Sequence, residues 1–568
     1  MAKAFIARMM HHLPKIRRVY AGNVITSRAS YSSPPLLDRF RWQAGALAFL
    51  VLIAYANSLG SSFHFDDAAI FANPGILRPD FGRGIFTLEQ TRPLTYLTFH
   101  WNYLAGGENP VFYHWVNLLL HAANCVLLLA LARRYLSPFT AGCVAAIFAL
   151  HPLQTESVTY VFARSTLLST HFALWVLWLH ARGKYFGSAI LFGISLLAKE
   201  ETIALPGFLL LLDLFERRRP KIGYYAALAG IAGLAAWRLF YAIHASPVDP
   251  GVGRVRGIPA ASYLLTQSRV LWIYLRLMIA PFGLNLDHDV PVSTGLLSPW
   301  TTLAAVVALA LLGLALAWLA WKKRSAAALW ALGFFVLISP SSSVVPQADV
   351  IFEHRTYLPM ICVVMALGFL LNGIARAKLA AGIAVLVPMM LAGTIVRNTT
   401  WHDERTLWTD IVGKSPGKGR GWLGMASLCW NDPAKAREYL SRGLAVDPGN
   451  AQLHTNYGIL LLSLNQPAEA LAHFQRAMAL VGKSADGWNN IGAAYLRMND
   501  TGASLNSFGR ALEMDPCNFN ARWNLTTLHA NRNQRQAAWQ AGTLPATCSI
   551  IPEQARALEE LRSQLAGP

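Results

Sequence analysis

Eleven apolar stretches in the first 400 residues limit what this chain can fold into. They lie at roughly 43–60, 112–132, 138–151, 161–181, 186–198, 202–215, 222–243, 299–321, 326–340, 357–375 and 379–396. A helix that crosses a bilayer needs about 20 apolar residues, so the longer stretches can span it and the shorter ones suit an internal site. Because backbone polar groups inside a bilayer must be satisfied within the element, the pattern predicts a polytopic helical bundle with about 11 spans.

The composition agrees with a membrane protein and excludes other classes. Of the 568 residues, 54% are hydrophobic and 14% charged, whereas a soluble domain carries about 25% charged residues. The net charge of +19 does not indicate a nucleic-acid partner, because the basic residues cluster beside the apolar stretches. The six cysteines show no metal-ligand spacing, so zinc is not expected. Cys517 and Cys548 could pair in an oxidising compartment.

Clusters of basic residues set the expected orientation. Residues 1–41 carry eight Lys and Arg residues against one acid, Asp38, which indicates a cytoplasmic tail more simply than a targeting peptide. If 262–281 lies in the membrane interface instead of crossing, eleven spans place every later basic cluster inside. These clusters are Arg133–Arg134, Arg182 with Lys184, Arg217–Lys221, Lys322–Arg324 and Arg376 with Lys378. The polar loops and everything after 396 are then expected outside.

A 34-residue period begins where the composition becomes soluble, at about 416. It relates Asn456, Asn490 and Asn524; Gly424, Gly458 and Gly492; Leu471 and Leu505; and Ala477 and Ala511. A two-helix unit of this length, with small residues where its helices cross, resembles the tetratricopeptide repeat. Three repeats over about 416–517, a degenerate fourth to about 541 and a capping helix at 552–565 predict an α-solenoid with a concave surface for peptide.

Acids, guanidinium groups and histidines gather in the loops of the expected outer face. The first such loop holds Asp66 and Asp67, and ionisable groups beside hydrocarbon are costly and tend to be functional. Transfer of a sugar from a lipid-linked phosphate to a hydroxyl needs a carboxylate to take the proton and cations to hold the phosphate. Asp66 or Asp67 is therefore the candidate base. The candidate substrate- and phosphate-binding residues are Arg92, His151, Glu156, Arg164, Lys199, Glu200, Glu353, Arg355 and Tyr357.

Each of these motifs also has a structural explanation. His151 can cap a helix end, Lys199–Glu201 can be charges at a membrane interface, and Arg355 can form an ion pair with Glu353. The aromatic residues between 99 and 115 are more typical of a membrane-interface belt than of a sugar platform. The functional hypothesis therefore depends on the convergence of the motifs.

Taken in order, these motifs resemble a known family over about 43–541. They are Phe65-Asp66-Asp67, Arg92–Thr95, Tyr113–His121, His151-Pro152 with Thr155-Glu156, Arg164, Lys199-Glu200, Ser339–Ser342 and Glu353–Pro359. As a set they are similar to the transmembrane and tetratricopeptide-repeat O-mannosyltransferases and their bacterial relatives, which are GT-C class membrane glycosyltransferases. The resemblance implies a polyprenyl- or dolichyl-phosphate sugar donor, inverting transfer to Ser or Thr, and a first-loop carboxylate that acts at the acceptor.

The resemblance leaves two features of the site open. Related loops often read Asp-Glu where this chain has Asp66-Asp67, so which of the two acts stays open. Some GT-C enzymes use a divalent metal and others do not. Since the loop offers no ligand set that can be completed, no metal or other cofactor is predicted.

The sequence thus predicts an all-α protein with a GT-C-like bundle followed by a tetratricopeptide-repeat solenoid. Its expected parts are a basic tail (1–41), a transmembrane catalytic domain (42–398), a linker (399–415), the repeats (416–541) and a capping segment (542–568). The expected function is glycosyl transfer to exported proteins recruited by the repeats. It would take place on the periplasmic side of a bacterial inner membrane, or in the lumen of the endoplasmic reticulum. A non-enzymatic scaffold for envelope proteins, and sugar transfer to a lipid or glycan, stay open as alternatives.

Overall fold

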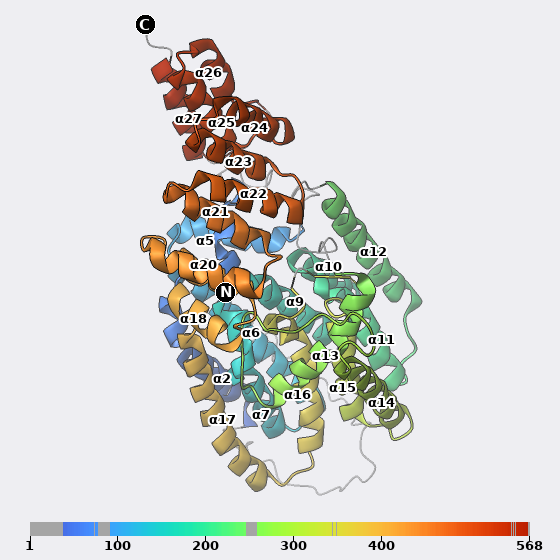
Figure 1. Cartoon of the computed structure of the whole chain (residues 1–568). Helices are drawn as coiled ribbons and strands as arrows, with labels where there is room; N and C mark the ends of the chain where they lie inside the picture. The colour runs from blue at the N-terminus through green and yellow to red at the C-terminus, as the bar shows by residue number, and fades with distance from the viewer. Residues whose placement is uncertain are drawn as a thin grey trace, which may run out of the picture.

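The computed structural model describes residues 38–72, 74–77, 91–245, 258–343, 345–347, 349–546, 548, 550 and 552–565. Within these ranges the protein is built from helices and contains no β-strand, which confirms the predicted all-α class. Most of the predicted basic tail, residues 1–37, lies outside the described residues. Figure 1 shows two parts, a bundle and a stack of short helices (α19 to α27) that extends from one end of it.

All eleven apolar stretches form helices. They are α2 (Phe40–Tyr55), α6 (Pro110–Tyr135), α7 (Pro138–Leu150), α9 (Arg164–Ala181), α10 (Tyr185–Ala198), α11 (Leu205–Phe215), α12 (Ile222–Ala245), α14 (Thr301–Trp321), α15 (Ala326–Ile338), α16 (Tyr357–Leu371) and α17 (Arg376–Thr399). In the described part of the chain, six helical segments are long and apolar enough to cross a membrane. These segments are Phe40–Gly60, Pro110–Tyr135, Ile222–Ala242, Thr301–Trp321, Glu353–Leu371 and Arg376–Thr399. The protein is therefore a membrane protein, and the count of 11 spans stays a prediction.

Further helices complete the bundle. Helix α13 (Ala260–Ile279), expected to lie in the interface, is not one of the six candidate spans. Its two arginines bond to the segment that follows it, Arg269 to the carbonyl of Pro291 and Arg276 to that of Phe282. Helix α5 (Pro93–Gly106) was not predicted from the apolar pattern, because it mixes polar and aromatic residues. Short helices include α3 (Ala68–Ala72), α4 (Pro74–Leu77) and α8 (Thr155–Thr159).

The repeat region folds as the 34-residue period predicts. Its helix pairs are α19 (Gly419–Ser427) with α20 (Pro433–Val446), α21 (Ala451–Ser463) with α22 (Pro467–Val481), α23 (Ala485–Arg497) with α24 (Thr501–Met514), and α25 (Phe519–Asn531) with α26 (Arg535–Gly542), followed by α27 (Pro552–Leu565). A Cβ at Gly458 would lie 2.5 Å from the Phe474 ring, and one at Gly492 2.7 Å from Phe508. The repeated glycines therefore let the two helices of a pair approach closely.

The turns of the repeats follow the same period. Asn465, Asn499 and Asn533 each end the first helix of a pair with positive φ, at 57°, 62° and 57°. Asparagine tolerates this left-handed conformation better than most residues, which explains its recurrence at this position. Cys517 and Cys548, whose pairing was left open, form a disulfide that joins the start of the last pair to the segment before α27.

The segment predicted as a linker, 399–415, is mostly helical. Helix α18 (Glu404–Lys414) begins with a capping box, in which the side chain of Asp403 accepts from the N–H of Thr406. A Cβ at Gly424 would lie only 2.1 Å from the ring of Trp408. Helix α18 therefore covers the first repeat and connects it closely to the bundle.

Candidate active site

The Asp loop, residues 61–67, is fixed against the end of α17. The N–H of Ser62 donates to the carbonyl of His402 at 3.0 Å, and His64 Nε2 donates to the carbonyl of Trp401 at 2.6 Å. Phe65 has a φ of 52°, a left-handed conformation that costs about 1–2 kcal/mol. Backbone strain in a bulky residue persists only where the surroundings enforce it, and it is concentrated at functional sites.

Asp67 is held inside the protein as a structural group. Its side chain has no exposed surface, and its two oxygens accept from the backbone N–H of His64 at 2.9 Å and of Phe162 at 2.7 Å. Burial raises the pKa of Asp67 to about 8, against these two hydrogen bonds that lower it. A carboxyl group so enclosed joins the Asp loop to the segment before α9, and it has no access to a substrate.

Asp66, the neighbouring residue, is exposed. Its N–H donates to the hydroxyl of Tyr160 at 3.3 Å. Partial desolvation raises the pKa of its carboxyl group, while the Tyr160 hydroxyl and the guanidinium group of Arg420 lower it. Tyr96 of α5 lies within electrostatic reach of both Asp66 and Arg92, since its pKa responds to both. Asp66 is therefore an accessible carboxylate beside a basic face.

Arg92 and Lys199 bring positive charge to this face, each with an acidic partner. The guanidinium group of Arg92 binds both carboxylate oxygens of Glu200, at 2.6 and 3.1 Å. Burial raises the pKa of Glu200 but the charge of Arg92 outweighs it, and the pKa falls to about 2. Lys199 Nζ lies 2.9 Å from Glu201 and donates to Thr166 at 2.9 Å. These partners fix the two cations in place.

In the part of the chain that the structure describes, Arg355 has a guanidinium nitrogen without a hydrogen-bond partner, as Arg397 and Arg420 also do. Its side chain is 6% exposed and its Nη2 donates to the backbone carbonyl of Asp349 at 2.8 Å. Its Nη1 has no hydrogen-bond partner in the described structure. Arg92, Lys199 and Arg355 all lie within electrostatic reach of His354. A buried guanidinium nitrogen without a partner is costly, so Arg355 is a candidate to hold an anionic oxygen.

Two acid–histidine pairs lie behind the basic face. Glu156 accepts from His354 Nδ1 at 2.5 Å and from the N–H of Glu353 at 3.2 Å. Glu353 accepts from His288 Nε2 at 2.8 Å and from the N–H of Asn285 at 2.7 Å. These bonds connect α8 to the segment around 285–288 and to the start of α16. The two pairs therefore hold Glu353 and His354, which directly precede Arg355 in the chain.

Three predicted site residues are bonded to other groups of the protein inside the bundle. His151 donates to the carbonyl of Met278 and accepts from the N–H of Leu153, so it caps a helix end. Arg164 has no exposed surface and donates to Asn117, Asn102, Thr98 and the carbonyl of Tyr113. Tyr357 is buried and bonds to His121 at 2.7 Å. Their contacts hold them inside the bundle, where Arg164 lies within electrostatic reach of Asp67.

The sequence analysis missed several residues that contact this site, among them Tyr160, Tyr96 and Arg420 of α19. The Nη2 atom of Arg420 lies 2.8 Å from the carboxylate of Asp349, and its guanidinium group lies over the ring of Phe65, 5.3 Å from the centroid. No pattern in the sequence could have found Arg420, because it belongs to the repeats and is far along the chain from the Asp loop. Within the described residues, no group of three or more His, Cys, Asp or Glu side chains could hold a metal ion, and the absence of a metal stays a prediction.

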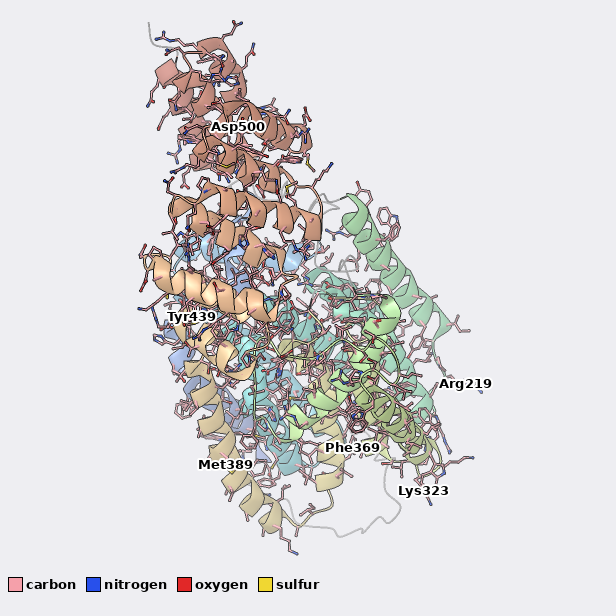
Figure 2. All side chains as sticks on the ribbon, in the orientation of Figure 1. Arg219, Lys323, Phe369, Met389, Tyr439 and Asp500 are labelled. Carbon is pink, nitrogen blue, oxygen red and sulfur yellow. A yellow bond between two sulfur atoms is a disulfide. The ribbon has the colours of Figure 1, made fainter. Side chains whose placement is uncertain are left out.

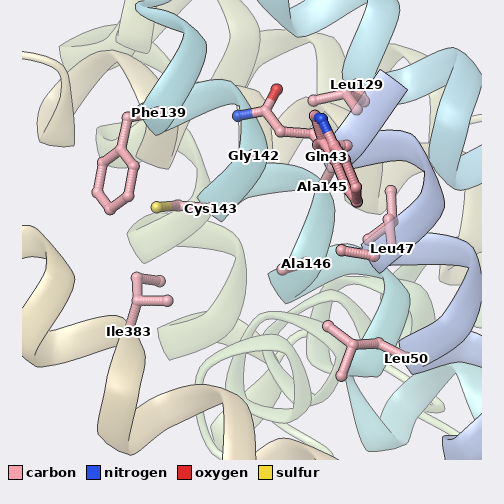
Figure 3. Close-up of a pocket in the computed structure, with 12 residues that line it drawn as sticks. Gln43, Leu47, Leu50, Leu129, Phe139, Gly142, Cys143, Ala145, Ala146 and Ile383 are labelled. Carbon is pink, nitrogen blue, oxygen red and sulfur yellow. The ribbon is translucent and has the colours of Figure 1, made fainter. Parts of the chain in front are cut away.

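An apolar crevice lies elsewhere in the bundle. Its volume is about 310 Å³, and Leu47 and Leu50 of α2, Ala146 of α7 and Ile383 of α17 line it. Figure 3 shows Phe139 and Cys143 on the side of this crevice nearer to Ile383. It contains neither Asp66 nor any of the three cations, so it is separate from the candidate site.

The fold and the site together define a class: a helical membrane protein with an exposed carboxylate beside a basic face and an attached tetratricopeptide-repeat solenoid. Two family models described as tetratricopeptide repeat match residues 431–491 and 485–517.

Known relatives identify the group of proteins that most of the chain resembles. The chain is 24% identical over 473 residues to the mouse protein O-mannosyl-transferase TMTC3, covering 72% of this chain and 51% of the relative. It is 22% identical over 444 residues to the Caenorhabditis elegans protein O-mannosyl-transferase F38B6.6, covering 73% and 59%. The expected resemblance to the transmembrane and tetratricopeptide-repeat O-mannosyltransferases is confirmed. The chain spans about half the length of these relatives.

A solved structure resembles about a third of the chain. The crystal structure of PilW, a type IV pilus biogenesis factor, covers 32% of this chain and 82% of its own, with 20% identity and a TM-score of 0.25. An overlap this weak carries no argument about function.

Proposed function

We propose that this protein is a membrane-embedded protein O-glycosyltransferase that uses a polyprenyl-phosphate sugar and modifies Ser or Thr hydroxyls. The observation that carries the proposal is the exposed Asp66 on a strained loop, beside a face that includes Arg355. The Nη1 atom of Arg355 has no hydrogen-bond partner in the described structure. The relatives named protein O-mannosyl-transferases support the same reaction class. Mannose and the acceptor class are carried over from those names.

In this proposal the reaction is a single displacement. Asp66 takes the proton of the acceptor hydroxyl as its oxygen attacks the anomeric carbon of the donor sugar. The bond between that carbon and the phosphate oxygen breaks, the lipid phosphate leaves with the electron pair, and the configuration inverts. Arg355, with Arg92 and Lys199 nearby, stabilises the negative charge on the leaving phosphate. Asp67 supports the loop and takes no proton from substrate.

The proposed orientation places the site and the repeats outside the cytoplasm. The basic clusters at Arg217–Lys221 and Lys322–Arg324 follow the positive-inside rule when the repeats are outside. Figure 2 shows Lys323 at the lower right of the bundle and Arg219 on its right-hand side, both away from Asp500 of the repeats. The Cys517–Cys548 disulfide suits an oxidising compartment such as a periplasm or lumen. An exported acceptor would reach the solenoid there.

Comparative mass spectrometry of envelope proteins tests the proposal. Cells that carry the wild-type protein should contain Ser or Thr peptides with a sugar-sized mass increment, and cells with Asp66→Asn should lack it. Asn has the size of Asp but takes up no proton, so we expect a loss of about 10²- to 10⁴-fold. Equal amounts of inserted protein are confirmed by membrane immunoblot.

Other outcomes select the alternatives. Label from a radioactive sugar donor that enters glycolipid and not protein would show transfer to a lipid or glycan. Identical spectra from wild type and variant would contradict the assigned role of Asp66 and favour a scaffold.

A further inference from the structure

Arg420 of the first repeat extends out of the solenoid to the Asp loop. Its guanidinium group lies 2.8 Å from the Asp349 carboxylate and 3.9 Å from that of Asp287, and it covers the ring of Phe65. The side chain is 32% exposed. It therefore lies at the surface where the solenoid, the Asp loop and the Asp349 segment meet.

The backbone around Arg420 is fixed by close packing on both sides. A Cβ at Gly419 would lie 2.7 Å from Leu453, and one at Gly421 would lie 3.0 Å from Ile411 of α18. Only residues without side chains fit these two positions without a shift of their neighbours. The start of α19 is thus held between α18 and α21, and Arg420 has little freedom of position.

Helix α18 and the residues after it are themselves bound to the bundle. Lys414 Nζ donates to the carbonyl of Leu284 at 2.7 Å, and the hydroxyl of Ser415 accepts from Asn285 Nδ2 at 2.8 Å. Asp410 accepts from Arg397 of α17 at 2.8 Å. The solenoid therefore begins on a rigid base beside the candidate site, and Arg420 is presented from that base.

Arg420 contacts both halves of the proposed chemistry. On one side it covers Phe65, whose strained backbone directly precedes Asp66. On the other it binds the side chain of Asp349, whose backbone carbonyl anchors the guanidinium group of Arg355. Asp66 therefore connects to Arg355 through a short series of contacts that passes through a residue of the repeats.

We propose that Arg420 is a positioning residue of the transfer site, through which the first repeat holds Asp66 and Arg355 in register. The inference rests on the proposed function, and it adds that the repeat domain is part of the transfer site as well as a surface for the acceptor. Loss of Arg420 would release the Phe65 turn and leave Asp349 and Asp287 with fewer counter-charges. The chemical groups would remain present but misplaced.

Two substitutions of Arg420 and one matched control test the inference in the full-length protein. Arg420→Met keeps the length of the side chain and removes its charge, and Arg420→Lys keeps the charge and loses the planar group that stacks on Phe65. Lys418→Met is the control, because Lys418 pairs with Asp287 at 3.3 Å in the same junction, whereas Arg420 also covers Phe65 of the Asp loop. All three are compared by in-cell glycosylation of the acceptor peptides and by melting temperature in detergent.

The expected result distinguishes a positioning role of Arg420 from a general effect of losing an ion pair at this junction. Arg420→Met should lower glycosylation by about 10- to 100-fold at a melting temperature close to that of Lys418→Met, with partial recovery in Arg420→Lys. Lys418→Met should stay within about threefold of wild type, since a surface ion pair contributes about 0–1 kcal/mol. Equal activity of Arg420→Met and Lys418→Met, or equal loss in both, would overturn the inference.

The pH dependence supplies a readout that a merely structural role would not change. The groups that face the Asp66 carboxyl are the Tyr160 and Tyr96 hydroxyls, the Arg420 guanidinium, and the carboxyl groups of Asp67 and Asp349. Arg420 lowers the pKa of Asp66, so its removal should shift the acidic limb of the rate profile to higher pH. An unmoved limb in Arg420→Met would contradict the inference. If wild-type cells show no glycosylated peptide at all, the proposed function itself fails. That outcome differs from failure of the Arg420 inference, in which wild-type cells glycosylate their acceptor and the variants do not differ as expected.

Discussion

Asp66 and Asp67 are the same residue type in adjacent positions, and the fold gives them opposite surroundings. Asp67 is buried with both oxygens occupied, whereas Asp66 is exposed beside Tyr160. The burial of Asp67 raises its pKa from 3.8 to about 8, so the folded state binds its proton more tightly than the unfolded state does. Stability from this group is therefore fully present below pH 3.8 and is lost as the pH rises through 8.

This linkage predicts a decrease in melting temperature between pH 6 and pH 9 that Asp67 itself causes. Asp67→Asn removes the titration, so the variant should show a smaller decrease over the same interval. It should also be less stable than wild type at pH 6 by about 1–3 kcal/mol, because the amide nitrogen faces a backbone N–H donor. Thermal unfolding of the two purified proteins measures both effects, and an unchanged pH slope in the variant would contradict them.

At the same scale, the sequence identified the types of residue at the site better than their roles. Three of the predicted cations, Arg92, Lys199 and Arg355, lie within electrostatic reach of one histidine, His354. The same prediction included Arg164 and Tyr357, which the fold buries among neutral partners. A charged residue in an apolar sequence indicates that a partner exists, but the identity of that partner depends on tertiary packing.

Elements were easier to predict where a period repeats. The spacing of Gly424, Gly458 and Gly492 indicated the pairing of the repeat helices, and two of the three meet an aromatic ring of the following helix. Gly424 instead meets Trp408 of α18, which the sequence analysis had assigned to a linker. That segment is short and polar, and its helix is stabilised by packing between the bundle and the first repeat, which no local pattern records.

The close crossing at Gly458 predicts the effect of a side chain there. Gly458→Val should destabilise the solenoid by about 1–3 kcal/mol, because the new atoms overlap the ring of Phe474. Gly509→Val is the matched control, since a Cβ at Gly509 of α24 meets nothing within 4 Å. Limited proteolysis of the repeat region in the full-length protein measures the difference. Equal protease resistance of the two variants would show that the crossing tolerates a larger residue.

For the whole molecule, the distribution of charge and the fold agree on one arrangement. The basic clusters that were expected inside include Arg219 and Lys323, which lie on the bundle away from the repeats (Figure 2), while the candidate site lies at the junction with the solenoid. In the proposed orientation, a single bilayer would separate the basic loops from both the site and the repeats. This separation is what a transferase with a lipid-linked donor and an exported acceptor requires.

The arrangement predicts which introduced thiols a membrane-impermeant maleimide can reach. Lys483→Cys, on an exposed turn of the repeats, should be labelled in intact spheroplasts, and Arg219→Cys or Lys323→Cys only after permeabilisation. Cys429 is replaced by Ser in all variants because it is partly exposed, whereas Cys125, Cys143 and Cys362 are buried and stay. The reverse labelling pattern would place the repeats in the cytoplasm. There an exported acceptor could not reach Asp66, so the proposed substrate class would be wrong even if transfer were observed.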